Sequence, residues 1–178
     1  MGPKYMTAGM GDAGACHPRD NIALRWLAEE YDVGYDMFNT IMGAREVQAK
    51  NLAHFLVEHS RGRPIVIHGK AYKPDVPFCI GSYSTLIGWY VEELGHNVVY
   101  LDPLADDQTN VVKNIDEASV VLMAHNRFIT YGYTGDVRDD SFYCPLPEGS
   151  TVIDPWRRLP KTMRNNIEVV HYGNTRKA

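Results

Sequence analysis

Residues 65–103 read IVIHGKAYKPDVPFCIGSYSTLIGWYVEELGHNVVYLDP, and this stretch decides the fold. It starts with a short apolar run, Ile65–Ile67, passes into a helical pattern over 85–94 that Gly95 closes, and ends in a second apolar run over 98–101. Strand, helix and strand in this order, with each strand continuously apolar, favour a parallel sheet that is covered on both faces. The stretch therefore predicts an α/β fold.

The same pattern continues towards the C-terminus. Apolar runs at 120–123, 151–153 and 169–170 predict three further strands, and residues 114–118 predict a short helix. Residues 130–148 are rich in turn formers and aromatic residues and show no clear period.

The N-terminal third has a different, helical character. Asp20 is a candidate cap for a helix that runs to about Tyr31, and a longer helical pattern runs from Asp36 to about His59. A helix of that length spans about 35 Å at ~1.5 Å per residue, which is typical of a spine or a dimer contact. We thus expect an α/β chain with a helical N-terminal segment, residues 1–60, whose long dimerisation helix precedes a Rossmann-like parallel-sheet domain, residues 61–178.

Composition excludes several classes of protein. The 178 residues are 44% hydrophobic and 22% charged, and no apolar run approaches the roughly 20 residues that a membrane helix needs. A net charge of −4 argues against nucleic acid as a partner. The three cysteines are odd in number and form no C-x-x-C, and the histidines are scattered, so we expect a reducing cytoplasm and no metal site.

One glycine motif is misleading. Gly9-Met-Gly11-Asp-Ala-Gly14 matches the dinucleotide fingerprint G-x-G-x-x-G letter for letter. That fingerprint needs a strand before it and a helix at its third glycine. The residues before Gly9 are too few and too broken by proline and glycine to supply the strand, so we do not interpret the motif as an NAD site.

Cys16 is the candidate for chemistry. It lies in Gly11-Asp-Ala-Gly-Ala-Cys16-His-Pro-Arg-Asp20, a glycine-rich loop just before a helix. A helix N-terminus and the neighbouring Arg19 both favour the nucleophilic thiolate, and Asp20 could orient a water or accept a proton. The alternative is a small inert cysteine beside a turn with Asp20 as a plain helix cap, and spacing alone leaves both interpretations open.

Four blocks together carry a resemblance. Residues 2–20 are similar to the segment G-P-K-F/Y-L-x-A-x-x-G-F/Y-G-G-x-C-x-P/Q-K-D, and 65–74 to V-x-x-L-G-x-A-F-K-P. Residues 93–103 are similar to L-x-x-x-G-A-x-V-x-x-Y-D-P, and 118–128 to A-D-A-V-V-I-x-T-x-H-x-x-F, with His125 and Phe128 in place. In this order the blocks cover nearly the whole chain, which resembles the C-terminal part of the UDP-glucose/GDP-mannose dehydrogenases, the nucleotide-sugar 6-dehydrogenases.

The resemblance implies a two-step oxidation of the sugar C6 alcohol to a carboxylate, with NAD as hydride acceptor in the complete enzyme. It implies that Cys16 forms the thiohemiacetal and thioester, that Asp20 helps to activate water, and that a UDP- or GDP-sugar binds between residues 1–60 and the 61–178 domain. The substrate-binding residues it implies are Tyr5, Gly9, Gly11, Gly14, Arg19 and Lys73. The family also dimerises through its central helix, which matches residues 36–59.

Departures from the family leave an alternative open. Ile80 replaces an arginine on the cofactor side, Asp12 replaces an aromatic residue, and no NAD-binding segment is recognisable in these residues. We therefore expect no tight NAD binding and no turnover by this chain without a separately supplied NAD-binding domain. The alternative function is a degenerate module that binds a sugar nucleotide or dimerises without redox activity. The residues do not distinguish UDP-glucose, GDP-mannose or an N-acetylated sugar as the ligand.

Overall fold

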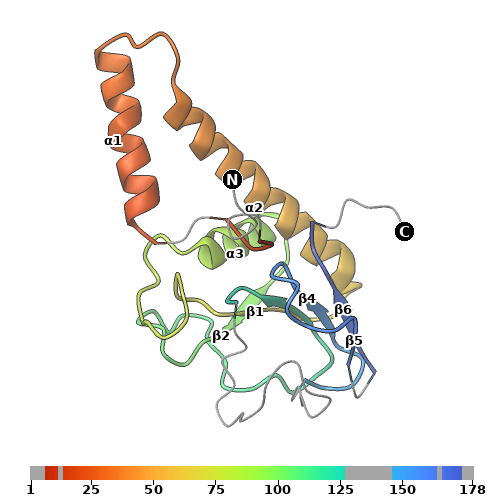
Figure 1. The fold of residues 1–178 in the computed structure, drawn as a ribbon. Coiled ribbons are helices and arrows are strands. Elements are labelled where there is room, and N and C mark those ends of the chain that lie inside the picture. Colours follow the sequence, from red (N-terminus) through yellow and green to blue (C-terminus); the bar gives the residue numbers. More distant parts are fainter. Residues whose placement is uncertain (1–6, 12–13, 127–145, 164–165, 174–178) are drawn as a thin grey trace.

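The computed structural model describes residues 7–11, 14–126, 146–163 and 166–173. Two helices come first, α1 (Cys16–Glu30) and α2 (Met37–Ser60), and form a helical hairpin whose tip stands away from the rest of the chain (Figure 1). An α/β body follows. It contains β1 (Ile65–His68), α3 (Tyr83–Glu93), β2 (Val98–Leu101), β3 (Val120–Met123), β4 (Thr151–Ile153), β5 (Thr162–Met163) and β6 (Ile167–Val170).

The described strands form a six-stranded sheet in the order β2-β1-β3-β4-β6-β5. Every neighbouring pair from β2 to β6 is parallel, and the register places Ile65 of β1 beside Val98 of β2 and Val120 of β3. The predicted α/β class with its parallel sheet is confirmed. The edge strand β5 is antiparallel to β6 and was not predicted, because its two residues carry no pattern.

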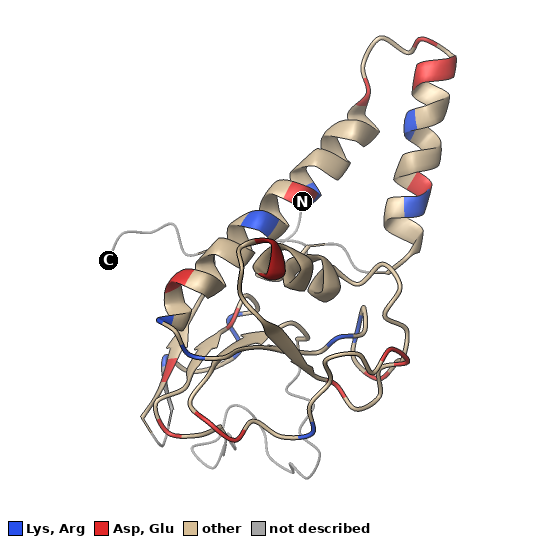
Figure 2. Cartoon of the chain, turned by 180° about the vertical axis from the view of Figure 1, so that it is seen from behind, with Lys and Arg blue, Asp and Glu red and all other residues tan. Residues whose placement is uncertain are grey.

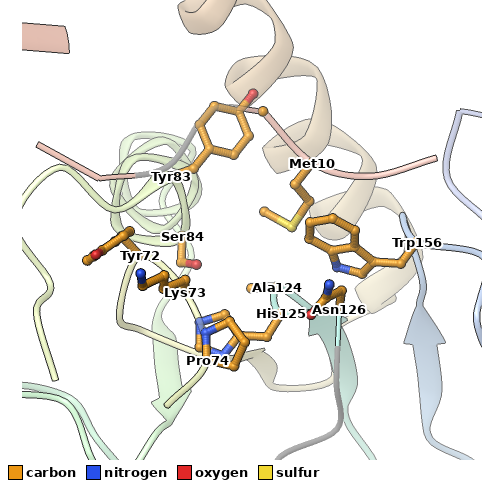
Figure 3. A pocket seen from close by; sticks show the side chains of 11 residues that line it. Met10, Tyr72, Lys73, Pro74, Tyr83, Ser84, Ala124, His125, Asn126 and Trp156 are labelled. Atoms are coloured by element: carbon orange, nitrogen blue, oxygen red, sulfur yellow. The ribbon is translucent and has the colours of Figure 1, made fainter. Parts of the chain in front are cut away.

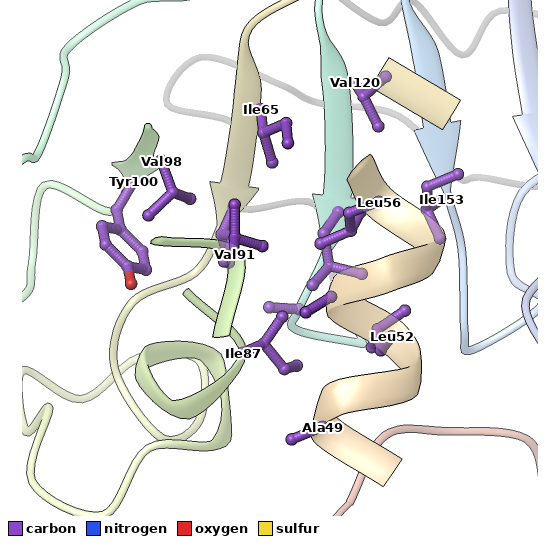
Figure 4. Packing of buried hydrophobic residues seen from close by; sticks show 14 of the residues in the cluster. Ala49, Leu52, Leu56, Ile65, Ile87, Val91, Val98, Tyr100, Val120 and Ile153 are labelled. Carbon is purple, nitrogen blue, oxygen red and sulfur yellow. The ribbon is translucent and has the colours of Figure 1, made fainter. Parts of the chain in front are cut away.

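Helices α2 and α3 cover one face of the sheet (Figure 4). Leu52 and Leu56 in the second half of α2 and Ile87 and Val91 in α3 are at most 2% exposed. They pack with Ile65 and other apolar side chains of β1, β3 and β4 in a single core cluster. The core thus includes the end of the long helix, which fixes the hairpin to the body.

The opposite face of the sheet is also apolar, but loops cover it. Val66, Val121 and Val152 point to this side and cluster with Leu146 and Leu159, which lie outside the strands. No helix packs on this face in the described ranges. The sequence prediction of a sheet covered on both faces therefore fits, with irregular chain on one side.

The hairpin contrasts with the body. No residue of α1 is buried, and Ile22 and Trp26 of α1 and Met37 and Ile41 of α2 are 42–59% exposed. Residues 37–44 at the start of α2 carry no charged side chain, as Figure 2 shows. The hairpin therefore presents apolar side chains to solvent, and within the described chain no helix is long and apolar enough to cross a bilayer.

Two sequence predictions of local structure are wrong. Helix α1 begins at Cys16 with Ala15 as its N-cap, so Asp20 lies inside the helix and does not cap it. Residues 114–118 form no helix and instead make an irregular link into β3. The long helix is confirmed as α2, whose cap Asp36 accepts a hydrogen bond from the Asn39 backbone N–H at 2.8 Å.

Candidate functional site

Cys16 is the first residue of α1 and is exposed. Its N-cap, Ala15, makes no side-chain hydrogen bond to the helix. The first backbone N–H groups of a helix have no partner within it, and they carry the positive end of the helix dipole. The thiol therefore lies at a helix N-terminus, as the sequence predicted, although the helix starts five residues earlier than expected, with Ala15 as its cap instead of Asp20.

Arg19 and Asp20 follow Cys16 on the first turns of α1. The Arg19 Nε donates a hydrogen bond to Asp20 Oδ1 at 2.8 Å, and both side chains are more than half exposed. The pKa of Arg19 is raised, first by this hydrogen bond, then by the Asp20 charge, and then by the charge of Cys16. The three predicted residues thus lie together at one end of α1, with Arg19 between the carboxylate and the thiol.

The three described glycines of the predicted loop each lie against an aromatic ring. A Cβ atom on Gly9 would lie 2.8 Å from the Trp156 ring, and one on Gly11 would lie 2.7 Å from the Tyr83 ring. A Cβ on Gly14, whose φ is +92°, would lie 3.0 Å from the Tyr72 ring. Glycine at these positions lets the loop pack closely onto the body. Tyr5, the other loop residue predicted for the substrate, lies outside the described residues.

A cavity of about 190 Å³ lies between this loop and the carboxyl ends of the parallel strands (Figure 3). Open α/β sheets bind ligands in this crevice. Its walls include Met10 and Gly11 of the loop. The body supplies the aromatic rings of Tyr72, Tyr83 and Trp156 and the polar side chains of Lys73, Ser84, His125 and Asn126.

The loop that carries Tyr72 and Lys73 is held by a buried carboxylate. Asp102, 2% exposed, follows β2, and its Oδ2 accepts hydrogen bonds from the Lys70 and Ala71 backbone N–H groups at 2.8 and 2.9 Å. Hydrogen bonds to an ionised acceptor are stronger than neutral ones. The Lys73 Nζ lies 5.2 Å from the centre of the Tyr72 ring, a cation–π distance. Asp102 therefore fixes the chain immediately before the predicted ligand-binding lysine.

Trp156 is placed in a similar way. Asp154, fully buried after β4, accepts a hydrogen bond from the Trp156 backbone N–H at 2.9 Å. The indole Nε1–H donates to the Met123 backbone carbonyl at 2.9 Å. Sequence reasoning missed Trp156, Tyr83 and Asn126 as cavity residues, because they come from separate segments that only the sheet brings together.

A second hollow, of about 340 Å³, lies at Cys16. It is lined by Gly14, Ala15, Cys16, Tyr72, Phe78 and Ile80. Tyr72 lines both this hollow and the Lys73 cavity. The structure therefore brings Lys73 and Cys16, 57 positions apart in the sequence, to two neighbouring hollows that share one aromatic side chain.

The arrangement defines an α/β protein with a ligand crevice at the carboxyl ends of its strands and a cysteine loop packed over it. No protein-family model matches the chain. The UDP-glucose 6-dehydrogenase TuaD of Bacillus subtilis is 26% identical over 75% of this chain and 28% of its own length. The chain therefore spans under a third of that relative.

Solved structures show the same fold. A GDP-mannose dehydrogenase from Pseudomonas aeruginosa matches 94% of this chain and 41% of its own, with a TM-score of 0.68 at 19% identity. A UDP-glucose dehydrogenase from Pyrobaculum islandicum matches 96% of this chain and 40% of its own, with a TM-score of 0.63 at 19% identity. The chain is thus similar, in sequence and in fold, to part of these nucleotide-sugar dehydrogenases.

Proposed function

We propose that this chain supplies the cysteine and the sugar-nucleotide-binding parts of a nucleotide-sugar 6-dehydrogenase. One observation carries the proposal: the Lys73 cavity and the Cys16 hollow meet at Tyr72. A ligand with its nucleotide in the Lys73 cavity could thus extend its sugar towards the Cys16 thiol. Gly9, Gly11 and Gly14 shape the loop between the two, and Arg19 lies beside the thiol. We also propose that residues 1–60 form the part with the cysteine loop and the central helices, and that residues 61–178 form the sugar-nucleotide-binding domain.

The composition of the first cavity supports a nucleotide. Aromatic side chains suit a planar base, and the Lys73 ammonium suits a phosphate as a point charge. The Asn126 side chain can both donate and accept hydrogen bonds. The name of the curated relative makes a UDP-sugar the first ligand to test, with a GDP-sugar as the second.

The chemistry proposed for this chain's own residues consists of two steps. The Cys16 thiol adds to an aldehyde at the sugar C6, which forms an S–C bond and moves the thiol proton to the former carbonyl oxygen. After oxidation of that carbon to a thioester, water attacks the carbonyl, the thiol leaves, and the carboxylate is released. Asp20 is the residue proposed to orient the water; its bond to Arg19 occupies Oδ1.

NAD, the hydride acceptor that the family resemblance implies, does not fit the described residues. None of the described strands is followed by the glycine triad that receives a dinucleotide. The side chains that line the hollow at Cys16 include Phe78 and Ile80, which are apolar and 57% and 77% exposed. The oxidation of the C6 alcohol to the aldehyde and that of the thiohemiacetal to the thioester each require a hydride acceptor, which a dinucleotide-binding unit would hold.

Ligand binding is the first test. We expect UDP-glucose to bind the chain in isothermal titration calorimetry, and Lys73→Met to weaken binding at least about tenfold, because a charge-assisted contact to phosphate contributes about 1.5–3 kcal/mol. Lys113→Met, at an exposed lysine outside the cavity, is the matched control. If UDP-glucose and GDP-mannose both fail to bind, or if both variants lose the same affinity, the site proposal is wrong.

Turnover is the second test. We expect no NADH from UDP-glucose and NAD with this chain alone, since its described residues offer no cradle for the acceptor. NADH formation that disappears in Cys16→Ser would contradict this expectation.

A second candidate function is a binding module without redox activity, and the apolar Phe78 and Ile80 beside Cys16 favour it. The two functions differ in what the thiol does with an aldehyde. A UDP-sugar whose C6 is an aldehyde should slow the alkylation of Cys16 more than the parent alcohol does if the thiol adds to it. Equal protection by the two sugars, despite binding, would favour the module.

We also propose a homodimer through the hairpin. The apolar side chains of α1 and of the first turns of α2 are exposed in the single chain, and large exposed apolar patches mark interaction sites. Burying Trp26 and Ile41 against a second copy would remove this surface from water.

A further inference from the structure

Gly81 lies directly against the backbone that leads into Cys16. A Cβ atom on Gly81 would be 2.6 Å from the Ala15 Cα, 2.7 Å from the Ala15 N and 2.8 Å from the Gly14 carbonyl carbon. All three are backbone atoms, so no side-chain rotation would relieve the contact. Any side chain at position 81 requires one of the two segments to move.

The body holds the segment around Gly81 firmly. The Cys79 backbone N–H donates to Asp106 Oδ1 at 3.0 Å, and the Ser82 N–H donates to the Cys79 carbonyl at 3.0 Å. The Ser82 side chain caps α3, which packs in the core. Gly14 packs on the Tyr72 ring, but the segment then continues into α1, which has no buried residue and so does not anchor it. A collision at Gly81 would thus displace the loop of residues 14–16 rather than the body.

We propose that Gly81 is a positioning residue for Cys16. Because Gly81 has no side chain, the start of α1 can pack closely against the body in the hollow lined by Tyr72, Phe78 and Ile80. This packing sets the position of the Cys16 thiol relative to the Lys73 cavity. This inference rests on the proposed role of Cys16 for its functional meaning. The placement itself can be tested without turnover.

The test compares two glycines with similar positive φ angles. Gly81 has a φ of +72° and Gly95 a φ of +82°, but a Cβ on Gly95 would meet nothing within 4 Å. Gly81→Ala and Gly95→Ala therefore share the strain of a left-handed alanine, and only the first adds a collision. Both variants are made in the full chain with Cys144→Ser, so that a trifluoromethyl thiol label reports on the exposed Cys16.

We expect the two variants to lose similar thermal stability. Only Gly81→Ala should shift the ¹⁹F resonance of labelled Cys16 and raise, several-fold, the rate at which unlabelled Cys16 reacts with iodoacetamide. In Gly81→Ala the affinity for UDP should stay within about twofold of the parent, because the body supplies most of the Lys73 cavity and its loop residues, Met10 and Gly11, lie outside the displaced residues 14–16. Protection of Cys16 by UDP-glucose should be lost. Such a split between binding and thiol placement would not follow from a general loosening of the fold.

If Gly81→Ala does not fold, Gly81→Asn against Gly95→Asn gives the same comparison with less strain, because asparagine tolerates the left-handed region. Unchanged resonance and alkylation at Cys16 in the Gly81 variant, or equal changes in the Gly95 variant, would overturn the positioning role. Failure of UDP-glucose to bind any of the proteins would instead count against the proposed function, and the resonance and the alkylation rate would still decide the role of Gly81.

Discussion

Helices α1 and α3 both carry apolar and polar side chains, but α3 packs into the core whereas α1 is largely exposed to solvent. The shorter helix α3 buries Tyr83, Ser84, Ile87, Gly88 and Val91 and is capped by Ser82, whose side chain accepts a hydrogen bond from the Ser84 N–H. The longer helix α1 buries no residue, and its cap residue makes no side-chain hydrogen bond. Its Trp26 side chain is 59% exposed.

Helix α3 is stabilised by contacts within the body, whereas α1 would need contacts beyond those that the hairpin itself provides. Isolated helices of ~12–15 residues are marginal in water, and most helical stability in proteins comes from packing. Helix α3 has its packing partner in the sheet. Helix α1 touches α2 but leaves its apolar side chains exposed, and the proposed homodimer would cover them.

The largest expected effect comes from the buried end of α2. Leu56→Ala should lower the free energy of unfolding by about 2–5 kcal/mol, because it removes a fully buried side chain and leaves a cavity. Leu24→Ala on α1, where the side chain is 40% exposed, should change it by no more than about 0.5 kcal/mol. Urea denaturation at low protein concentration measures both. A cost at Leu24 equal to that at Leu56 would mean that the contrast between body and hairpin is wrong.

The next effect concerns association through the hairpin. Ile41→Glu should weaken self-association by about 2 kcal/mol, or roughly 30-fold in the dissociation constant, if Ile41 is a central contact of the dimer. Sedimentation velocity over a range of concentrations gives the constant. Asn114→Glu adds the same charge at an exposed position of the body and should leave association unchanged. A wild-type chain that stays monomeric at tens of micromolar would remove the basis of this prediction.

Thiol reactivity sharpens the same contrast. Cys16 at the start of the hairpin is exposed, whereas Cys79 in the body is 7% exposed and burial raises the pKa of its thiol. We expect iodoacetamide to alkylate Cys16 at least about tenfold faster than Cys79 near neutral pH, since the thiolate is the reactive form. Time-resolved peptide mass measurement gives both rates in one sample. Similar rates at the two positions would support the alternative that Cys16 is an ordinary thiol without an activating environment. Cys144 lies outside the described residues, so its alkylation rate is not used in this comparison.

The smallest expected effect is a change of stability with pH in the body. The hydrogen bond from Lys70 Nζ, 2.9 Å from Asp107 Oδ2, lowers the pKa of Asp107 from 3.8 to about 2. A carboxyl whose pKa is lower in the folded state stabilises the fold above its unfolded pKa and loses that contribution as pH falls through the folded value. Asp107→Asn should therefore melt below the wild type at pH 6, and the gap should narrow between about pH 4 and pH 2. A gap that is constant over this range would show that the ion pair does not act in the folded protein.

The α/β class and the long helix could be predicted from the residues alone, and the same residues marked the candidate cysteine segment. Continuous apolar runs such as 65–67 and 120–123 have few alternatives to buried strands, and Asp36 marks the start of α2 by its capping chemistry. Cys16, Arg19 and Asp20 lie close together because residues three and four apart on a helix share a face, but the structure revealed this, since the sequence had placed the helix start at Asp20. Their catalytic roles stay predictions.

Only the tertiary structure decided where these pieces meet. Lys73 and Cys16 come to neighbouring hollows because parallel strands bring their carboxyl ends, and the loops that follow them, to one edge of the sheet. Trp156 and Tyr83 join the cavity for the same reason, and the packing of Gly9, Gly11 and Gly81 has no sign in a local pattern. Local periodicity records which side of an element is buried, whereas these contacts depend on the order of the strands, which a single sequence pattern does not encode.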